Sequence, residues 1–389
     1  MATYQFETIT AQQAQSITAA DQVLFCGGPA RAASVTYQSY DPLALTPEPP
    51  RILVTYEGRT VAFGTDIVQV SRAGGLVMAD GSRLAIGDAG GGAIKGGTGD
   101  DGLYGGPGAD TLEGGGGDDL LHGGSGDDLL NGGAGANVIY GGQGADTVNA
   151  SEFREAQGSW VHGNQGDDFL AGGDGADTIY GGQGDDFIGG KDGDDWISGD
   201  RGGDEIHAGS GNDTVSGGDG GDVIHSTDGS DLLRGDDGDD MLIVYGRGAT
   251  TVDGGAGNDT MVSASQDSSV LYGGEGRDRF EIIANSPPRE GADDVIADWQ
   301  AGDRLHFPQV SIYSILPRQY SEIVAADYDT ALSLAQQHIT FTGATYVAAQ
   351  VGSDVIVFAD TNGDSSDGPD TAVVLAGRTL ADIAYSDFV

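Results

Sequence analysis

Aspartate recurs at intervals of nine residues through the middle of this chain, in a sequence that is rich in glycine. The chain has 389 residues, with 70 Gly, 61 acidic and 17 basic side chains and a formal net charge of −44. Carboxylates are hard oxygen ligands that suit Ca²⁺, and glycine permits the sharp turns that expose backbone carbonyls to an ion. The pattern therefore predicts that several Ca²⁺ ions bind. The candidate metal ligands are Asp101, Asp110, Asp119, Asp128, Asp146, Asp168, Asp177, Asp186, Asp195, Asp204, Asp213, Asp222, Asp231, Asp240, Asp259 and Asp278.

The composition argues against several other classes of protein. A net charge of −44 does not suit a protein that neutralises phosphates, so nucleic acid is not an expected partner. No apolar run is long enough for a membrane span. The N-terminal sequence has no basic start followed by an apolar stretch, so a Sec-type signal peptide is not expected. The single cysteine, Cys26, excludes an internal disulfide framework, and its apolar neighbours predict burial.

The aspartates belong to a nonapeptide with the pattern Gly-Gly-x-Gly-x-Asp-x-apolar-x. Residues 96–149 hold six such units and residues 163–243 hold nine, with Asn137 in place of the aspartate once. The later units at 245–253 and 264–272 lose the aspartate but keep the apolar residue. Because the apolar pattern outlasts the ligand pattern, we expect a continuous stack in which some turns bind no metal.

This nonapeptide resembles the repeat of the RTX, or hemolysin-type calcium-binding, proteins, over about half of the chain. The resemblance implies an all-β fold, a calcium-bound parallel β-roll with two nonapeptides per turn. In that family six residues form the calcium loop and three form a strand, whose apolar eighth residue points inward. Leu112 should then stack on Leu130, and Leu121 on Ile139. On the order of a dozen ions are expected, with dissociation constants of about 10⁻⁴–10⁻³ M.

The segments on either side of the repeats differ from them in composition. We therefore expect three domains, at residues 1–86, 87–281 and 282–389. The first is a small β-rich module, in which residues 51–64 read as two strands around Glu57-Gly58. A further strand pair is expected at 76–78 and 84–86.

The third domain reads as mostly β with one helix. Residues 327–339 carry apolar side chains at helical spacing. Its strands are expected within 294–307 (two strands and a turn), 340–351, 354–359 and 371–375.

The C-terminal region resembles the tail shared by many RTX proteins that are exported by type I secretion machinery. The matching stretches are 294–307, 356–364 and 374–377, together with the ending Asp387-Phe388-Val389. The resemblance implies one-step export through an ABC-transporter channel, without N-terminal cleavage. A chain that stays unfolded in a low-calcium cytosol and folds outside fits this route. The expected location is extracellular, including association with the cell surface.

Motifs of the common secreted enzymes are absent from the sequence. Neither the H-E-x-x-H of zinc proteases nor the G-x-S-x-G of lipases occurs. A G-x-G-x-x-G match at residues 97–102 lies inside the repeat, with no strand–helix unit after it. We therefore predict a protein that is not an enzyme.

Two further features face outward in the expected roll. His207 and His225 occupy ninth places 18 residues apart, where they are either a transition-metal pair or two solvated imidazoles. Apolar residues at the seventh place form either an association surface or only a preference for strand. They are Phe169, Phe187, Trp196, Val223, Leu232 and Met241.

Three functions remain open from the sequence. The leading hypothesis is a secreted calcium-binding structural or interaction protein of a cell-surface, S-layer-like, filament or biofilm-matrix assembly, formed by self-association. The first alternative is a calcium-dependent module that binds a carbohydrate, such as a cell-surface polysaccharide, or another partner. The second alternative is a secreted enzyme of a class that the sequence does not reveal.

Overall fold

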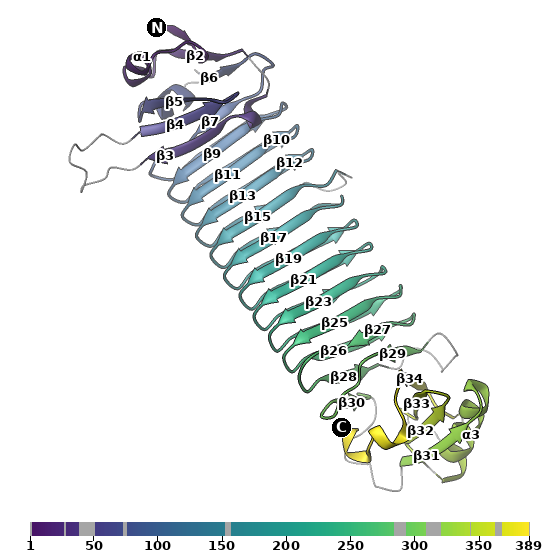
Figure 1. Cartoon of the computed structure of the whole chain (residues 1–389). Coiled ribbons are helices and arrows are strands. Elements are labelled where there is room, and N and C mark those ends of the chain that lie inside the picture. Colours follow the sequence, from purple (N-terminus) through teal and green to yellow (C-terminus); the bar gives the residue numbers. More distant parts are fainter. Residues whose placement is uncertain are drawn as a thin grey trace, which may run out of the picture. The chain divides into compact units, whose positions relative to one another are not determined.

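The computed structural model divides the chain into two compact units, Met1–Asp192 and Gly193–Val389, which are described in turn. Strands are the main element of both units (Figure 1). The structure describes residues 2–26, 29–38, 51–72, 76–151, 157–283, 293–308, 320–342, 344–361 and 368–388.

The first unit begins with a module of two small sheets. Strands β1, β2 and β6 form a parallel sheet, and β3, β4 and β5 form an antiparallel one. The expected strands around Glu57-Gly58 are confirmed as β4 and β5, with both turn residues at positive φ. The elements are β1 (Thr3–Gln5), α1 (Ala11–Gln15), β2 (Gln22–Phe25), a 3₁₀ turn (Ala30–Ala32), β3 (Ser34–Gln38), β4 (Arg51–Tyr56), β5 (Arg59–Gly64), α2 (Ile67–Arg72) and β6 (Leu76–Met78).

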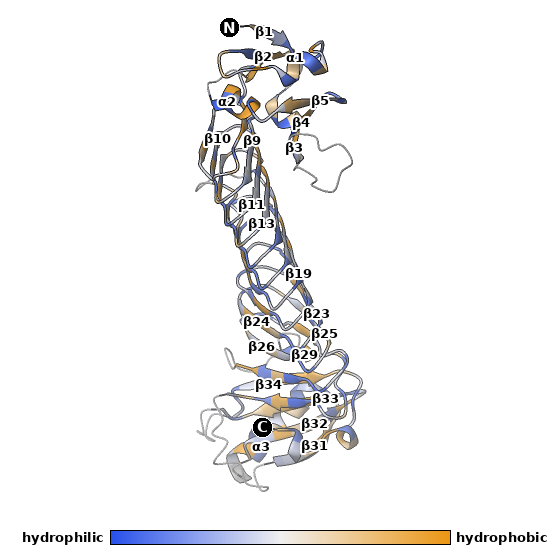
Figure 2. Ribbon diagram, turned by 90° about the vertical axis from the view of Figure 1, so that its left-hand side faces the viewer, coloured by the Kyte–Doolittle hydropathy of each residue, from blue (hydrophilic) through white to orange (hydrophobic). Residues whose placement is uncertain are grey.

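The two helices of this module were not expected from the sequence. Helix α1 is short and begins at a capping box, in which Thr10 and Gln13 bond reciprocally. Helix α2 buries apolar residues, which are orange in Figure 2. Both helices contribute to a core that continues onto Leu84, Ile86 and Tyr104 of the first stacked strands. The module therefore covers the end of the stack, where apolar surface would otherwise meet water.

Two parallel sheets make up the rest of the first unit. Successive strands alternate between the sheets, so each strand pairs with the strand two places along the chain. One sheet contains β7 (Leu84–Ile86), β9 (Gly102–Pro107), β11 (Leu120–Ser125), β13 (Val138–Gln143), β15 (Trp160–Gln165) and β17 (Thr178–Gln183). The other contains β8 (Ala93–Gly97), β10 (Thr111–Gly116), β12 (Leu129–Ala134), β14 (Thr147–Asn149), β16 (Phe169–Ala171) and β18 (Phe187–Asp192).

The expected hairpin of residues 76–78 and 84–86 is wrong. Both segments are strands, but β6 pairs with β2, whereas β7 pairs in parallel with β9. Only an isolated bridge from Val77 to Arg83 joins them. Strand β7 thus belongs to the stack: its buried Ala85 pairs with Leu103, the inward residue of β9, while Leu84 and Ile86 face the core of the module.

The second unit has the same two-sheet arrangement. One sheet begins with β19 (Trp196–Arg201), β21 (Thr214–Asp219), β23 (Leu232–Asp237), β25 (Thr251–Ala256), β27 (Val270–Tyr272) and β29 (Asp294–Ile296). The other contains β20 (Glu205–Ser210), β22 (Val223–Ser226), β24 (Met241–Gly246), β26 (Thr260–Ser265), β28 (Arg279–Ile282) and β30 (Arg304–His306). Each unit is therefore a parallel β-solenoid, as the fold class predicted.

The apolar eighth residues form columns inside each solenoid. Leu112 pairs with Leu130 and Leu121 with Ile139, at the expected spacing of 18 residues. These four side chains have no exposed surface. Burying one apolar side chain of this size contributes about 1.5–3 kcal/mol, so each turn is held by its two inward residues.

A small α/β region completes the second unit. Strand β29 pairs with β34 (Thr371–Leu375), which begins an extension through β33 (Asp354–Ala359), β32 (Tyr346–Val351) and β31 (Tyr320–Ala325). Helix α3 (Tyr328–Thr342), the longest helix among the described residues, confirms the helical spacing, but it includes residues 340–342, which were expected to be strand. Two 3₁₀ turns follow, Leu380–Asp382 and Tyr385–Asp387.

Two further expectations concern the burial of Cys26 and the absence of membrane-spanning segments. Cys26 is exposed rather than buried, because the side chains of β2 alternate and it follows the buried Phe25. Of the helices that the structure describes, none combines the length and apolar character that crossing a membrane requires.

Candidate metal centres

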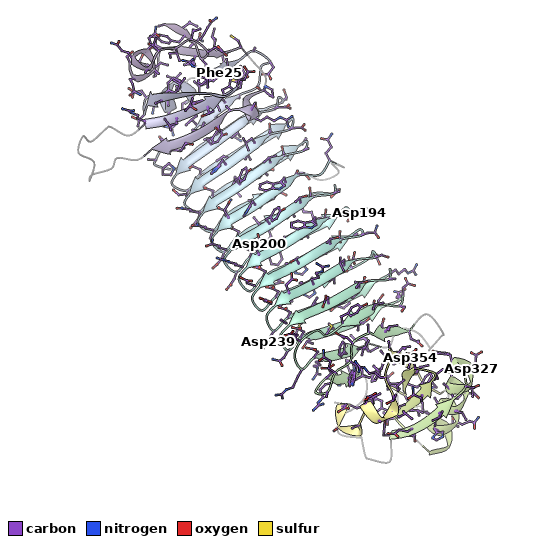
Figure 3. All side chains as sticks on the ribbon, viewed as in Figure 1. Phe25, Asp194, Asp200, Asp239, Asp327 and Asp354 are labelled. Atoms are coloured by element: carbon purple, nitrogen blue, oxygen red, sulfur yellow. The ribbon has the colours of Figure 1, made fainter. Side chains whose placement is uncertain are left out.

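The repeat aspartates lie in the loops that join the two sheets, next to the start of a strand. Asp101 precedes β9 and Asp110 precedes β10, and this placement recurs through both units. All sixteen side chains are buried, with exposed fractions of 1–3%. Figure 3 shows the loop residues Asp194 and Asp239 at opposite edges of the stacked strands. The aspartates therefore form two rows in each solenoid, one along each edge.

One of the two oxygens of each carboxylate, Oδ1, links its loop to the loop one turn earlier in the chain. The backbone N–H of Asp101 donates to Oδ1 of Asp119 at 2.8 Å. The same bond joins the N–H of Asp204 to Oδ1 of Asp222 in the second unit, also at 2.8 Å. These bonds fix the orientation of the carboxylate, so the position of Oδ2 is set by the fold.

The second carboxylate oxygen is buried without a hydrogen-bond partner at most of these positions within the described chain. An unpaired buried polar atom costs about 1–3 kcal/mol, and more when it is charged. A cation in the loop would supply the missing partner. The atoms concerned are Oδ2 of Asp101, Asp110, Asp119, Asp128, Asp146, Asp168, Asp213, Asp222, Asp240, Asp259 and Asp278.

Backbone carbonyls of the next turn converge on the same space. A Cβ placed on Gly105, the first glycine of its unit, would lie 2.8 Å from Asp110 Oδ2 and 2.4 Å from the carbonyl oxygen of Gly123. The space is lined by oxygen atoms and excludes a side chain, which explains the glycine at the first place. Converging carboxylate and carbonyl oxygens are the donors that Ca²⁺ takes, so the residues present fit this ion.

The pKa is raised at each of the carboxyl groups named above whose Oδ2 has no hydrogen-bond partner within the described chain. Burial is the main cause, and the backbone N–H bond to Oδ1 opposes it, while neighbouring aspartates raise the pKa further. The pKa rises to about 7 for Asp119, Asp146, Asp222 and Asp259. It rises to about 6 for Asp128, Asp168, Asp213 and Asp240. Each row therefore disfavours its own ionised form unless a cation balances it.

Two loops contain a nitrogen donor of the chain itself. Asn137 Nδ2 donates to the carbonyls of Ala150 at 3.0 Å and Gly135 at 3.2 Å. Lys191 Nζ donates to the carbonyl of Gly172 at 2.6 Å. Burial raises the pKa of the nearby Asp177, and the charge of Lys191 opposes part of that rise. In both loops, carbonyl oxygens accept from a positively polarised group, which is the role that a cation would have at the other loops.

Two candidate ligands were missed by sequence reasoning. The N–H of Ser269 donates to Asp294 Oδ1 at 2.8 Å, and the N–H of Asp278 donates to Asp303 Oδ1 at 3.2 Å. These bonds continue both rows of the second unit beyond residue 281. The sequence did contain a signal for Asp294, because it begins an Asp-x-apolar pattern that ends in the buried Ile296. The glycines that precede the aspartate in the other units are absent here.

The sequence of this region matches a family model for the RTX calcium-binding nonapeptide repeat. The chain carries RTX calcium-binding repeats. They bind Ca²⁺ at multiple sites, and the loops described above contain the oxygen donors. The matched residues are 86–121, 122–153, 162–191, 189–224, 216–244 and 246–270.

Three solved structures are similar to parts of this chain. A subunit of the Azotobacter vinelandii mannuronan C5-epimerase is 21% identical, with a TM-score of 0.24 over 46% of this chain and 78% of that chain. A hyperactive, Ca²⁺-dependent, β-helical antifreeze protein from an Antarctic bacterium is 18% identical, with a TM-score of 0.34 over 78% and 89%. The extracellular lipase LipA from Serratia marcescens is 17% identical, with a TM-score of 0.18 over 62% and 41%. No curated protein matches the sequence.

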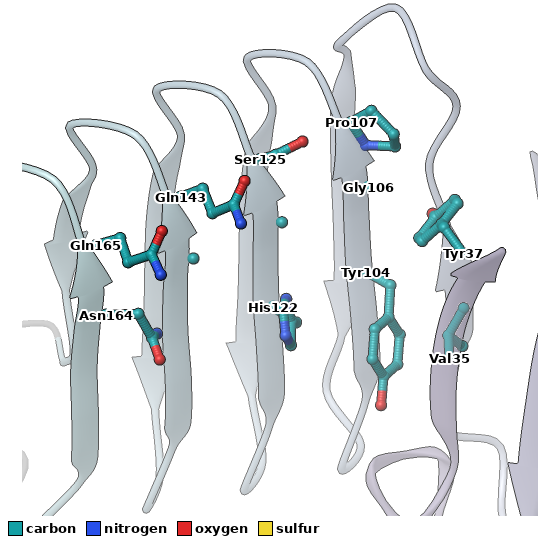
Figure 4. Close-up of a pocket in the computed structure, with 12 residues that line it drawn as sticks. Val35, Tyr37, Tyr104, Gly106, Pro107, His122, Ser125, Gln143, Asn164 and Gln165 are labelled. Atoms are coloured by element: carbon teal, nitrogen blue, oxygen red, sulfur yellow. The ribbon is translucent and has the colours of Figure 1, made fainter. Parts of the chain in front are cut away.

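A groove of about 410 Å³ lies beside the first RTX turns. Tyr37 of β3 faces strands β9 to β15 across it, and Gln143 and Gln165 lie on neighbouring strands of its wall (Figure 4). Tyr104 and His122 belong to an aromatic column, with ring centroids 6.1 Å apart and planes within 22°. Because these rings stack on one another, they expose edges rather than faces to the groove.

Proposed function

We propose that this protein is a non-enzymatic, extracellular calcium-binding protein whose solenoid folds on external Ca²⁺ and then serves a structural or interaction role in a cell-surface or matrix assembly. The observation that carries this proposal is that, in the aspartate rows, Oδ2 of the eleven aspartates named above is buried without a hydrogen-bond partner within the described chain. A cation would balance these charges, and the β-solenoid would present flat outer faces to a partner.

The sixteen repeat aspartates are the proposed Ca²⁺ ligands, together with Asp294 and Asp303. At the eleven aspartates named above whose Oδ2 has no hydrogen-bond partner within the described chain, Oδ2 and the carbonyls of the adjoining turn would bind the ion, while Oδ1 keeps its bond to the backbone. The half-buried side chain of Asp294 and its raised pKa of about 6, caused mainly by desolvation of the carboxyl group, support the same role.

Export in an unfolded state is part of this proposal. A chain that needs Ca²⁺ at about 10⁻⁴–10⁻³ M would remain unfolded where the ion is scarce. Such a chain can pass through a type I secretion channel and fold on the outside. The C-terminal stretches that resemble those of exported RTX proteins support this route.

A second copy of the chain is the proposed partner of the outer face formed by β16 and β18. Phe169 and Phe187 are directly paired there, with ring centroids 5.0 Å apart and planes within 1°. Phe169 is 47% exposed, although a large apolar side chain at an exposed site gains nothing from folding of the single chain. A flat, regular β face with aligned apolar rings suits association with an identical face.

The double variant Phe169→Thr/Phe187→Thr is expected to abolish calcium-dependent assembly. Threonine keeps the strand preference but removes the apolar surface. Light scattering and electron microscopy with and without Ca²⁺ would show the mass falling to that of the 39.5 kDa monomer. The variant Tyr272→Thr, at a residue 40% exposed on β27, is the matched control. An oligomer that the double variant leaves unchanged excludes this face.

The groove favours carbohydrate binding as a second candidate function. Amide side chains on adjacent strands can bond to sugar hydroxyls, and Gln143 and Gln165 stand in one row about 4.8 Å apart across the sheet. The row continues to Gln183, which pairs with Gln165 but does not line the groove.

A glycan array probed in Ca²⁺ tests this candidate function. If the groove binds a polysaccharide, Gln143→Ala/Gln165→Ala should lose about 5-fold to 150-fold in affinity, since each of the two lost bonds contributes roughly 0.5–1.5 kcal/mol. Gln183→Ala should bind like the unmodified chain. Equal loss in both variants would place binding outside the groove, and no binding by the unmodified chain would rule the function out.

A further inference from the structure

A cluster of nitrogen and oxygen donors lies on the outer face of β20 and β22, apart from the calcium loops. His207 and His225 are directly opposite one another in the parallel register of these strands. Their ring centroids are 4.6 Å apart, with planes within 13°. Glu205 lies on the same face two residues before His207, and its Oε1 is 2.9 Å from His207 Nε2. One donor atom from each residue lies within 4.8 Å of the other two.

The fold places these three side chains together through two independent periodicities. Residues two apart on a strand share a face, which aligns Glu205 with His207. The turn length of the solenoid brings His225 beside His207. On the next strand, Ile243 pairs with His225 and is 8% exposed, so one side of the cluster is walled by an apolar residue. Both imidazoles are half-buried, and the carboxylate is exposed.

The chemistry of this donor set differs from that of the calcium loops. Imidazole nitrogen is a poor ligand for Ca²⁺, which takes oxygen, but it suits Zn²⁺ and neighbouring first-row ions. Two imidazoles and one carboxylate are a common three-residue set for Zn²⁺, with water in the fourth position. Metal–ligand bonds of about 2.0–2.2 Å would draw the donors closer than their present separation, which side-chain rotation permits at this face.

We propose that Glu205, His207 and His225 form a second class of metal site that binds one borderline divalent ion such as Zn²⁺. The site goes beyond the calcium function, because it lies on the outside of the sheet and uses different donors. The ion would join two successive turns of the solenoid, since β20 and β22 are neighbouring strands. With three ligands from the chain, the fourth position stays open to water or to a donor from a partner molecule.

Titration calorimetry with ZnCl₂ in saturating CaCl₂ tests the proposal. Saturating Ca²⁺ occupies the carboxylate loops, and circular dichroism verifies that the solenoid is folded. The unmodified chain is expected to bind one Zn²⁺, and His207→Asn/His225→Asn to lose this binding. Glu205→Gln, which keeps both imidazoles, should weaken it by at least about tenfold. The variant His162→Asn, at a ninth-place histidine in the first unit, should behave like the unmodified chain.

Electron paramagnetic resonance of the Cu²⁺-loaded chain gives a second measurement that needs no variant. Coupling to two imidazole nitrogens is expected. A spectrum with oxygen ligands alone, or Zn²⁺ binding that survives in the folded double variant, overturns the site. If the chain does not fold in Ca²⁺ at all, the calcium proposal fails instead, and circular dichroism distinguishes the two failures.

Discussion

Removal of calcium with EGTA at neutral pH is expected to unfold the repeat region, with loss of the β-sheet signal in circular dichroism and an increase in the radius of gyration. Successive aspartates of a row stand one turn apart, at about 4.8 Å. Two charges at that distance repel by roughly 3 kcal/mol at an effective dielectric of about 20. This repulsion is as large as the roughly 1.5–3 kcal/mol from burying one apolar side chain, so the ion decides the balance.

Refolding should be cooperative as Ca²⁺ is restored, because each ion lies between oxygens of neighbouring turns and its binding free energy is also folding free energy. Mg²⁺ at the same concentration should not substitute, since it is smaller, demands octahedral geometry and keeps its water. Signals that are identical in EGTA and in millimolar CaCl₂ would contradict the role proposed for the aspartate rows.

Adjacent aspartates of one loop offer a matched pair of variants for this prediction. Asp240 is 3% exposed, and its Oδ2 has no hydrogen-bond partner within the described chain. Asp239 is exposed and accepts bonds from the backbone and side chain of Asn258. Asp240→Ala should raise the Ca²⁺ concentration needed for half-folding, whereas Asp239→Ala should change it little. A larger effect of Asp239→Ala than of Asp240→Ala would instead assign the ion to the exposed carboxylates of the loops.

Protons are expected to substitute partly for calcium. The pKa of Asp119 and Asp222 is raised to about 7 in the folded chain, mainly by burial, from an ordinary value of 3.8. Between these values the folded chain binds more protons than the unfolded chain, so the stability of the metal-free fold falls as the pH rises. The stabilising effect is complete below about pH 3.8 and is lost by about pH 7.

Two measurements follow from this linkage. In EGTA, circular dichroism should show more residual structure at about pH 5 than at about pH 7.5. In titrations with Ca²⁺, the apparent affinity should be more than about tenfold lower at about pH 5 than at about pH 7.5, because at the lower pH the ion must displace protons from the carboxylates. A metal-free chain that is equally unfolded at both pH values, or a Ca²⁺ affinity independent of pH, would contradict the buried placement of these groups.

Much of the solenoid could be predicted because its repeat is local. Every unit carries its own turn glycines, its aspartate and its inward residue, so each nonapeptide specifies the same loop and strand. The pairing of Leu112 with Leu130 follows from that period together with the likeness to RTX repeats. The two units without aspartate still form turns of the solenoid, because they keep the inward apolar residue. Thr250 and Ser269 are buried at the position that aspartate has in the other units.

The prediction was less successful where pairing joins segments that lack the repeat. The two strands expected within 294–307 are present as β29 and β30. Their partners were not evident from the sequence: β29 pairs with β27 and β34, and β30 pairs with β28. Each strand therefore pairs with the last strand of its own sheet in the stack, and not with the strand next to it in the sequence. Asp294 and Asp303 entered the rows through this pairing, across a separation of 25 residues.

The sequence by itself determined the repeat, the ion that it suits and the inward and outward faces, because these depend on residues within a single nonapeptide. Only the tertiary structure decided which oxygen of each carboxylate is bonded and which is left for an ion, since that depends on the N–H of another turn. It also decided how the ends of the stack are covered and that Glu205 meets two imidazoles, because those contacts join residues brought together by strand pairing.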